Sequence, residues 1–172
     1  GLEYPIVMKL VSGNIIHKTD AGYVKVGLKD REQAESAFRE LSPYTEGGSY
    51  VAVQEMIKGG FEVILGFKRD ASFGSILMAG AGGIYAEVLK DIVLEVDDLD
   101  IERAKSAIRK LKIFPLLDGA RGRAKLDSDA LAEALVSLAR LAKEHPEIKE
   151  ADINPLFVLE KGIVAVDGRL II

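Results

Sequence analysis

The chain has 172 residues, of which 48% are hydrophobic and 29% are charged, a balance typical of a soluble globular domain. The net charge is −4 and the 23 Lys and Arg residues form no basic stripe, so nucleic-acid binding is not expected. Cysteine is absent, which excludes disulfides and thiolate metal sites. The sequence has neither a signal peptide nor an apolar run long enough to span a bilayer, so we expect a cytoplasmic protein without a membrane partner.

The first residues are unusual for a complete protein. Gly1-Leu2-Glu3-Tyr4-Pro5 leads directly into an apolar run, with no Met, cap or leading helix before it. We therefore expect a fragment whose N-terminal part is missing. Asn and Gln are scarce while Lys, Glu and Arg are abundant, a composition that hints at a thermophilic source.

Apolar periodicity and turn residues predict the elements in chain order. Strands are expected at residues 6–11, 22–28, 50–57, 61–67, 74–78, 92–96, 153–159 and 163–166. Helices are expected at 31–41, with Asp30 as N-cap, at 101–111 and at 128–145. The strands at 50–57 and 61–67 are expected to form a hairpin around Gly59-Gly60, and the last two strands a closing hairpin around Lys161-Gly162. The irregular alternation favours an α+β fold with mixed or antiparallel sheets.

His17 is one of two histidines and lies in a short polar loop between the first two predicted strands. Lys18 follows it and Asp20 lies three residues on, a setting suited to a charged phosphoryl group. Imidazole is a nucleophile at neutral pH because its unperturbed pKa is about 6.5. The alternative from the local sequence is a solvated or hydrogen-bonded loop residue. The other histidine, His145, ends a helix and receives no functional role.

The closing hairpin gathers oxygen ligands. Asp152 and Asn154 are two residues apart on a predicted strand and therefore point to the same face. Folding back around the turn places Asp167 roughly opposite Asn154. Amide and carboxylate oxygens suit Mg²⁺, which completes its shell with water and substrate phosphates. The alternative is that these residues face solvent at the strand ends.

Residues 80–83, Gly-Ala-Gly-Gly, are expected to form a loop that can approach a phosphate closely. No Gly-Lys-Ser/Thr follows, so this is not a Walker loop. Glu87 adds a carboxylate that could orient a phosphate-binding cation or a metal-bound water. A plain tight turn is the alternative.

Three further positions are candidates for nucleotide contacts. Lys9 interrupts an apolar strand and faces either solvent or an anion in a cleft. The strand end at Gln54-Glu55-Met56 could present backbone groups to an adenine edge, or be an ordinary strand end. Arg121 lies between small residues and could clamp an anion through two bonds, or lie on a surface loop.

Taken together, the motifs resemble the ATP-grasp domain of ADP-forming acyl-CoA synthetases, such as ADP-forming acetate–CoA ligase, over essentially the whole chain. The short motifs that carry the resemblance, in order, are Tyr4-Pro5-Ile6-Val7-Met8-Lys9, His17-Lys18-Thr19-Asp20 with Gly22, Val53-Gln54-Glu55-Met56, Gly60-Phe61-Glu62-Val63, Asp70 with Phe73-Gly74, Gly80-Ala81-Gly82-Gly83 with Glu87, Gly119-Ala120-Arg121-Gly122, Asp152-Ile153-Asn154-Pro155-Leu156 and Val164-Ala165-Val166-Asp167-Gly168-Arg169. Their joint order and spacing are more specific than any single motif.

The resemblance implies two α+β lobes that clasp ATP, a smaller lobe at about residues 1–55 and a larger lobe at about 56–172. It assigns residues as follows: Lys9 to the ATP phosphates, Gln54, Glu55 and Met56 to the adenine-binding hinge, Glu62 to the ribose, Gly82, Gly83 and Glu87 to the nucleotide, Arg121 to catalysis, and Asn154 and Asp167 to Mg²⁺.

In this resemblance His17 is the second histidine of a phosphoryl relay. A CoA-binding alpha subunit or domain, in a heterotetramer, binds acyl-CoA and phosphate and carries the first phosphohistidine. His17 then receives the phosphoryl group and delivers it to ADP. The overall reaction is acyl-CoA + ADP + phosphate ⇌ carboxylic acid + CoA + ATP, with electrostatic stabilisation by Mg²⁺, Lys9 and Arg121.

The sequence departs from the family pattern in two places. The family has paired glycines after the histidine loop where this chain has Gly22-Tyr23. We expect Tyr23 to stiffen the loop and limit its swing. The family domain also begins with a helical segment before the Tyr4-Pro5 strand, which this chain lacks.

Two other classes of function remain open at this point. One is a regulatory ATP-grasp module of a protein acetyltransferase fusion, which binds nucleotide without turnover. The other is a non-catalytic interaction domain that keeps only the fold.

Overall fold

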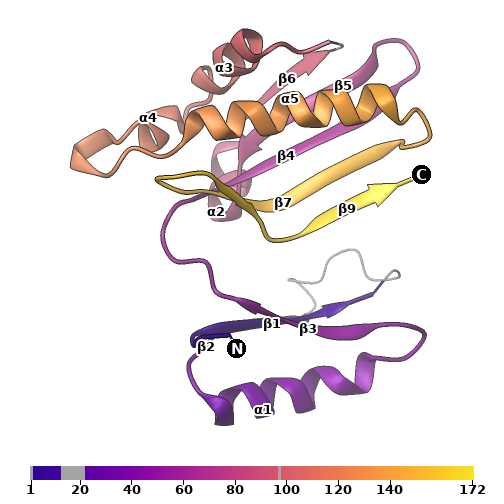
Figure 1. Ribbon diagram of the computed structural model, residues 1–172, viewed down its shortest axis with the longest axis vertical. Coiled ribbons are helices and arrows are strands. Elements are labelled where there is room, and N and C mark those ends of the chain that lie inside the picture. The colour runs from indigo at the N-terminus through magenta and orange to yellow at the C-terminus, as the bar shows by residue number, and fades with distance from the viewer. Residues whose placement is uncertain (1, 13–21, 97) are drawn as a thin grey trace. The chain divides into compact units, whose positions relative to one another are not determined.

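The structure is a computed structural model that describes residues 2–12, 22–96 and 98–172 (Figure 1). His17 and its neighbours Lys18 and Asp20 lie outside the described residues. The elements along the described chain are β1 (Ile6–Val11), β2 (Val24–Leu28), α1 (Arg31–Leu41), η1 (Ser42–Tyr44), β3 (Tyr50–Glu55), β4 (Phe61–Asp70), β5 (Gly74–Ala81), α2 (Gly83–Leu89), β6 (Ile92–Val96), α3 (Ile101–Arg109), α4 (Phe114–Leu117), η2 (Ala120–Gly122), α5 (Ser128–Glu144), β7 (Glu150–Val158), β8 (Ile163–Ala165) and β9 (Gly168–Ile171).

The chain divides into two compact units, and the first is Gly1–Lys58. Its three strands form an antiparallel sheet in the order β2-β1-β3, and α1 covers one face of that sheet (Figure 1). Asp30 caps α1, because its Oδ1 accepts the Gln33 backbone N–H at 2.9 Å. The core between helix and sheet consists of Ile6, Met8, Leu10, Ala34, Ala37 and Leu41.

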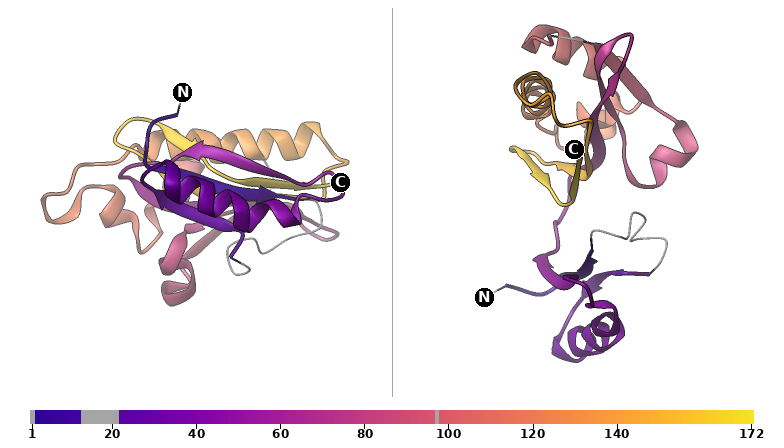
Figure 2. Two further views of the ribbon diagram at one scale, coloured as in Figure 1. Left: turned by 90° about the horizontal axis from the view of Figure 1, so that it is seen from below. Right: turned by 90° about the vertical axis from the view of Figure 1, so that its right-hand side faces the viewer.

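The second unit, Gly59–Ile172, has its own core. Its strands run in the order β6-β5-β4-β7-β8, with β9 also paired to β7, and every pairing is antiparallel. Helices α3 and α5 lie on the same face of this sheet (Figure 2). Four leucines of α5 fall at helical spacing in the sequence, which predicts one apolar face; Leu131, Leu135 and Leu138 are buried in this core, and Leu141 packs against it partly buried.

The α+β class with antiparallel sheets is confirmed. The bounds of β1, α1 and β6 agree with the sequence prediction. For α1 and β1 the local sequence pattern is sufficient to predict the bounds of the element. A helix or strand with one buried face repeats its apolar residues at the period of that element.

The predicted hairpin of residues 50–57 and 61–67 around Gly59-Gly60 is wrong. β3 pairs with β1 in the smaller sheet, whereas β4 pairs with β5 and β7 in the larger one. Gly60 has φ +78°, and a Cβ there would lie 2.6 Å from the Val158 carbonyl oxygen. This glycine therefore lets the chain enter the second unit close to the end of β7. In the sequence, a glycine pair with this role cannot be distinguished from the turn of a hairpin.

The predicted loop at residues 80–83 is also wrong. Gly80 and Ala81 are the last residues of β5, Gly82 is the N-cap of α2, and Gly83 begins that helix. A Cβ at Gly80 would lie 2.9 Å from Cγ2 of Ile92, so the small residue allows β6 to approach β5 closely. At least one of the glycines that suggested a loop, Gly80, therefore leaves space for packing within the sheet and is not part of a turn.

The sequence prediction missed several short elements. Helices α2 and α4 and the 3₁₀ turns η1 and η2 are too short for periodicity to detect. Strand β7 begins at Glu150, before the predicted start at residue 153, and β9 follows the closing hairpin as an additional strand. Within the described parts of the chain, the helices are all too short or too polar to cross a membrane.

Candidate functional site

Lys9 and Gln54 project from the same face of the smaller sheet. Lys9 pairs with Ala52 and Gln54 pairs with Val7, so the alternation of the strands places both on the face opposite Met8, which packs with α1. Lys9 is only 7% exposed. A buried ammonium and an amide on one helix-free sheet face form a polar surface suited to an anionic, aromatic ligand.

The Gln54 side chain carries an unusual feature. Its Oε1 atom is buried and has no hydrogen-bond partner among the described residues. A buried amide oxygen without a donor costs free energy, so this oxygen is a candidate acceptor for a ligand N–H. Next to it, the Met56 N–H donates to the Pro5 carbonyl at 3.4 Å, while Glu55 and Met56 are exposed.

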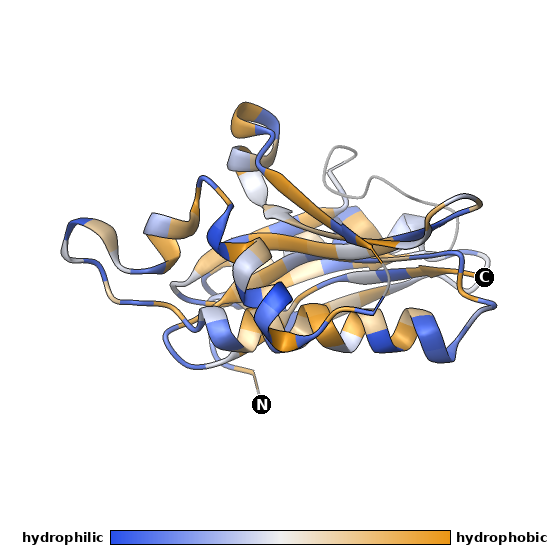
Figure 3. Ribbon diagram, turned by 90° about the horizontal axis from the view of Figure 1, so that it is seen from above, coloured by the Kyte–Doolittle hydropathy of each residue, from blue (hydrophilic) through white to orange (hydrophobic). Residues whose placement is uncertain are grey.

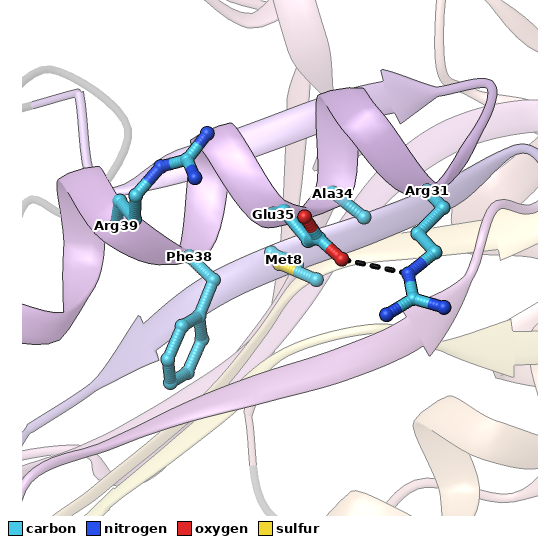
Figure 4. Close-up of a pocket in the computed structure, with 6 residues that line it drawn as sticks. All are labelled: Met8, Arg31, Ala34, Glu35, Phe38 and Arg39. Carbon is cyan, nitrogen blue, oxygen red and sulfur yellow. Dashed lines mark hydrogen bonds and ion pairs between the residues drawn. The ribbon is translucent and has the colours of Figure 1, made fainter.

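A hollow of about 430 Å³ lies on the helical side of the same unit (Figure 4). Its walls are Met8, Arg31, Ala34, Glu35, Phe38 and Arg39. Arg31 donates to Glu35 at 2.7 Å across it. The hollow contains none of the residues predicted to bind nucleotide; Lys9 and Gln54 lie on the other face of this sheet.

In the larger unit the structure brings Glu62 together with Gly82 and Gly83. The Gly82 N–H donates to the Glu62 carbonyl at 2.9 Å. A Cβ at Gly83 would lie 2.6 Å from Glu62 Oε2, and a Cβ at Gly82 would lie 2.9 Å from the Glu62 carbonyl carbon. Glycine is therefore needed at both positions to keep this carboxylate against the start of α2.

Glu87 lies one helical turn beyond Gly83 on α2 and is exposed. The ring of Tyr85 stacks on Phe61, with centroids 5.3 Å apart and planes at 24°. This aromatic pair beside Glu62 was not predicted. The sequence signal for it is an aromatic residue next to each polar candidate, Phe61 before Glu62 and Tyr85 between Gly83 and Glu87.

The closing segment brings Asn154 and Asp167 together. The Asn154 N–H donates to the Asp167 carbonyl at 3.0 Å, and the Val166 N–H donates to the Pro155 carbonyl at 3.0 Å. Asp167 Oδ1 accepts the Gly168 N–H at 3.1 Å. An amide oxygen and a carboxylate on adjacent backbone segments are the hard oxygen donors that Mg²⁺ prefers.

Asp152, on the same strand, is used differently. Its Oδ1 accepts from Arg169 Nε at 2.9 Å, and this contact raises the pKa of the Arg169 guanidinium. In the described parts of the chain no cluster of three or more His, Cys, Asp or Glu side chains could hold a metal ion. An ion bound at Asn154 and Asp167 would therefore take its remaining ligands from water and phosphate oxygens.

Arg121 lies in η2 with φ +58°, is exposed, and makes no hydrogen bond or ion pair with any described residue. It is therefore not joined to the other candidates of its unit. Lys9 and Gln54 belong to one unit, whereas Glu62, Gly82, Gly83, Glu87, Arg121, Asn154 and Asp167 belong to the other.

Tyr23 lies just after residues 13–21, the stretch outside the described residues. Its ring meets that of Tyr44 edge-on, with centroids 4.9 Å apart, and it packs against the core of the smaller unit. Its carbonyl accepts the Leu10 N–H at 3.0 Å. The chain is therefore anchored at residue 23, six residues after His17.

Comparison with known proteins gives consistent results. A family model described as an ATP-grasp domain matches residues 1–172. The beta subunit of ADP-forming acetate–CoA ligase I from Pyrococcus furiosus is 45% identical over 177 residues, covering 99% of this chain and 76% of the relative. The ADP-forming 4-hydroxybutyrate–CoA ligase of Nitrosopumilus maritimus is 41% identical over 94% of this chain, which spans 24% of that protein.

Solved structures show the same fold. Dinucleotide-forming acetyl-coenzyme A synthetase 1 of Ca. Korarchaeum cryptofilum, in complex with coenzyme A, Ca-AMPCP and HgCl⁺, has a TM-score of 0.89 at 36% identity, with 99% of this chain and 77% of that chain covered. A second structure of that protein carries coenzyme A and Mg-AMPPCP and has its phosphohistidine segment pointing towards the nucleotide binding site. Its TM-score is 0.84 at 38% identity, with 99% and 77% covered.

Proposed function

The chain belongs to the ATP-grasp domain family, and from this membership we propose that it is the nucleotide-binding part of an ADP-forming acyl-CoA synthetase. The observation that carries the proposal is its 45% identity, over nearly its whole length, to a beta subunit of that enzyme class. The helix-free face with Lys9 and Gln54 and the Asn154–Asp167 contact supply the chemistry that such a subunit needs.

Nucleotide recognition is assigned to residues of both units. The Lys9 ammonium binds phosphate oxygens, and the unpartnered Gln54 Oε1 accepts a hydrogen bond from the base. Glu55 and Met56 complete the hinge, and Glu62 lies near the ribose. Gly82 and Gly83 hold Glu62 in place through the contact described above, with Glu87 on the same helix.

Asn154 and Asp167 would hold Mg²⁺, which when bound neutralises charge on the phosphate oxygens. Arg121 adds a further guanidinium for the transferring phosphoryl group, since it has no partner among the described residues. These groups position the phosphates and stabilise the negative charge on the transferring phosphoryl group. Such positioning and stabilisation are the main requirements of phosphoryl transfer.

His17 is the phosphoryl carrier in this proposal. A CoA-binding alpha subunit or domain transfers a phosphoryl group to the imidazole, and His17 passes it to ADP. The net reaction converts acyl-CoA, ADP and phosphate to carboxylic acid, CoA and ATP. We place the protein in the cytoplasm and, with its partner, in a heterotetramer.

The regulatory alternative is not favoured. The relatives reported above are named as ligases or synthetases, and none of those names describes an acetyltransferase fusion.

The relay is tested by phosphate transfer from ATP. The chain and its CoA-binding partner are incubated with Mg²⁺ and γ-labelled ATP, and acid-labile phosphate is mapped by mass spectrometry. We expect label on His17 in the wild type and none in His17→Asn. His145→Asn is the matched control, because His145 is the other histidine and its imidazole Nδ1 lies 3.0 Å from the Glu147 carboxylate on the surface. Full synthetase activity in His17→Asn would disprove the relay.

The adenine hinge is tested by Gln54→Leu. Removing the buried acceptor should weaken ATP binding by about tenfold, the equivalent of one lost hydrogen bond. Isothermal titration calorimetry measures the affinity. Gln33→Leu is the control, since Gln33 accepts from the Lys29 N–H at the start of α1 and lies outside the proposed hinge. Equal affinities in the two variants would exclude Gln54 from the hinge.

A further inference from the structure

Helix α2 has few contacts of its own to hold it in place. It has seven residues and buries none of them, and its N-cap is Gly82, which has no side chain to cap the helix. Figure 3 shows hydrophobic residues among its turns, at the top of that view, yet Ile84 and Val88 are 75% and 78% exposed. A helix this short is unstable in water by itself, so the position of its first turn depends on what that turn contacts.

The first turn of α2 contacts two consecutive residues of β4. Gly83 lies against Glu62, since a Cβ at Gly83 would be 2.6 Å from Glu62 Oε2, and the Tyr85 ring stacks on Phe61 with centroids 5.3 Å apart. Consecutive strand residues point to opposite faces. Two helix residues that are two positions apart lie about 200° apart around the axis. The turn therefore contacts the start of β4 on both of its faces.

Phe61 gives the Tyr85 ring a fixed surface, because Phe61 packs against the core of the larger unit. At the other end of α2, Leu89 packs against the same core, and its carbonyl accepts from Lys112 Nζ at 3.5 Å. Leu89 is the last residue of the helix, so these contacts hold the last turn and not the first. The stack of Tyr85 on Phe61 thus secures the turn that lies next to Glu62.

The Glu62 carboxylate has free acceptor positions. It makes no hydrogen bond or ion pair with any described residue, so packing against Gly83 determines where it points. An ionised carboxylate can accept several hydrogen bonds on its two oxygens. It therefore suits a ligand with two adjacent hydroxyl groups, such as the 2′- and 3′-hydroxyls of a ribose.

We propose that Tyr85 is a positioning residue for nucleotide binding, which acts through Phe61 and Glu62. Its stack on Phe61 holds the first turn of α2 against β4, and Gly83 in that turn keeps the Glu62 carboxylate directed at the ribose hydroxyls. This role rests on the proposed function, in which Glu62 lies near the ribose. The ring at residue 85 then sets how well the protein distinguishes a ribonucleotide from its 2′-deoxy form.

The role is tested by comparing two nucleotides. Affinities for ADP and 2′-deoxy-ADP, each with Mg²⁺, are measured by isothermal titration calorimetry on the full chain with its CoA-binding partner. In the wild type ADP should bind about tenfold more tightly, the equivalent of one hydrogen bond to a charged group. Tyr85→Leu should lower this ratio by about threefold or more, because the aromatic stack no longer fixes the turn beside Glu62.

Tyr85→Phe keeps the ring and should retain the wild-type ratio. Phe38→Leu is the matched control, since Phe38 is 49% exposed on α1 and belongs to no proposed nucleotide contact, and it should leave both affinities unchanged. Circular dichroism verifies that each variant is folded. If the Tyr85 ring only stabilised the larger unit, Tyr85→Leu would weaken both nucleotides by the same factor. The unchanged ratio would overturn the proposal.

Glu62→Ala distinguishes this failure from a failure of the proposed function. It should lower the ratio to about one, because the acceptor of the 2′-hydroxyl is removed. If Glu62→Ala lowers the ratio and Tyr85→Leu does not, the ribose assignment stands and Tyr85 has no positioning role. If both variants keep the wild-type ratio, Glu62 does not bind the ribose, and both the assignment and the role of Tyr85 are wrong.

Discussion

At the scale of single residues, buried polar groups determine where the chain can turn. Asp91 is 5% exposed, and its two carboxylate oxygens accept the backbone N–H groups of Lys112 and Ile113, each at 2.9 Å. One side chain before β6 thus satisfies both donors that lead into α4. The position of this turn depends on a contact between residues more than twenty apart in the sequence.

Asp91→Ala should therefore lower the free energy of unfolding by about 3 kcal/mol, because two amides are left without acceptors. Asp118→Ala is the matched control. Its carboxylate pairs with Lys125 at 2.7 Å but is 48% exposed, and its loss should cost about 0.5 kcal/mol. Urea denaturation measures both, and similar losses in the two variants would refute the role of Asp91.

Some of the candidate site follows from the sequence at this scale, and some does not. Residues on one strand, or on two strands of a hairpin, have faces fixed by alternation, so the proximity of Asn154 and Asp167 was predictable. The ion pair of Asp152 with Arg169 was not, because β9 was missed and pairs with β7 from outside the predicted hairpin. The isolation of the Gln54 amide oxygen is likewise a property of packing that no local pattern records.

At the scale of elements, helix α5 and the β7–β8 turn share one carboxylate. Asp127 accepts the Ala130 N–H at 2.9 Å as the N-cap of α5, and its other oxygen accepts the Gly162 N–H at 2.8 Å. These two bonds lower the pKa of Asp127 below its ordinary value of 3.8. The charged form is thus the one that holds helix and turn together.

The pH dependence follows from the direction of that shift. A carboxyl group with a lowered folded-state pKa stabilises the fold above its unfolded pKa, and the contribution is lost as the pH falls through the folded pKa. The difference in unfolding free energy between wild type and Asp127→Asn should be constant near neutral pH and shrink below the ordinary value of 3.8. Denaturation curves across this range test it, and a difference independent of pH would show that Asp127 is not the titrating group.

The pairing of the strands explains why part of the fold could not be predicted from the sequence. Periodicity identified β1, α1 and β6 with correct bounds, since each buries one face. It could not tell that β3 and β4, adjacent in sequence, belong to different sheets, because partner choice depends on distant strands. Gly80 illustrates the same limit, as the close approach of Ile92 that requires glycine is visible only in the fold.

At the scale of the whole molecule, the chain has two separate hydrophobic cores. The smaller core includes Leu41, and the larger includes Leu135, each 1% exposed. Since each core belongs to one compact unit, a local loss of packing should destabilise that unit first.

Leu41→Ala should cost about 2–5 kcal/mol and reduce hydrogen-exchange protection in β1, β3 and α1 while leaving β4 and β7 unchanged. Leu135→Ala should produce the opposite pattern. Native-state hydrogen exchange followed by mass spectrometry distinguishes them. Equal loss of protection throughout the chain in both variants would show one cooperative unit.

The Asp127 carboxylate also bears on the order in which the larger unit assembles. Its bond to the Ala130 N–H joins residues three apart, whereas its bond to the Gly162 N–H joins residues 35 apart. The first can form as soon as α5 begins to coil, but the second has to wait until β7 and its turn are in place, because a long loop must close first. One side chain thus takes part in both an early and a late step of folding.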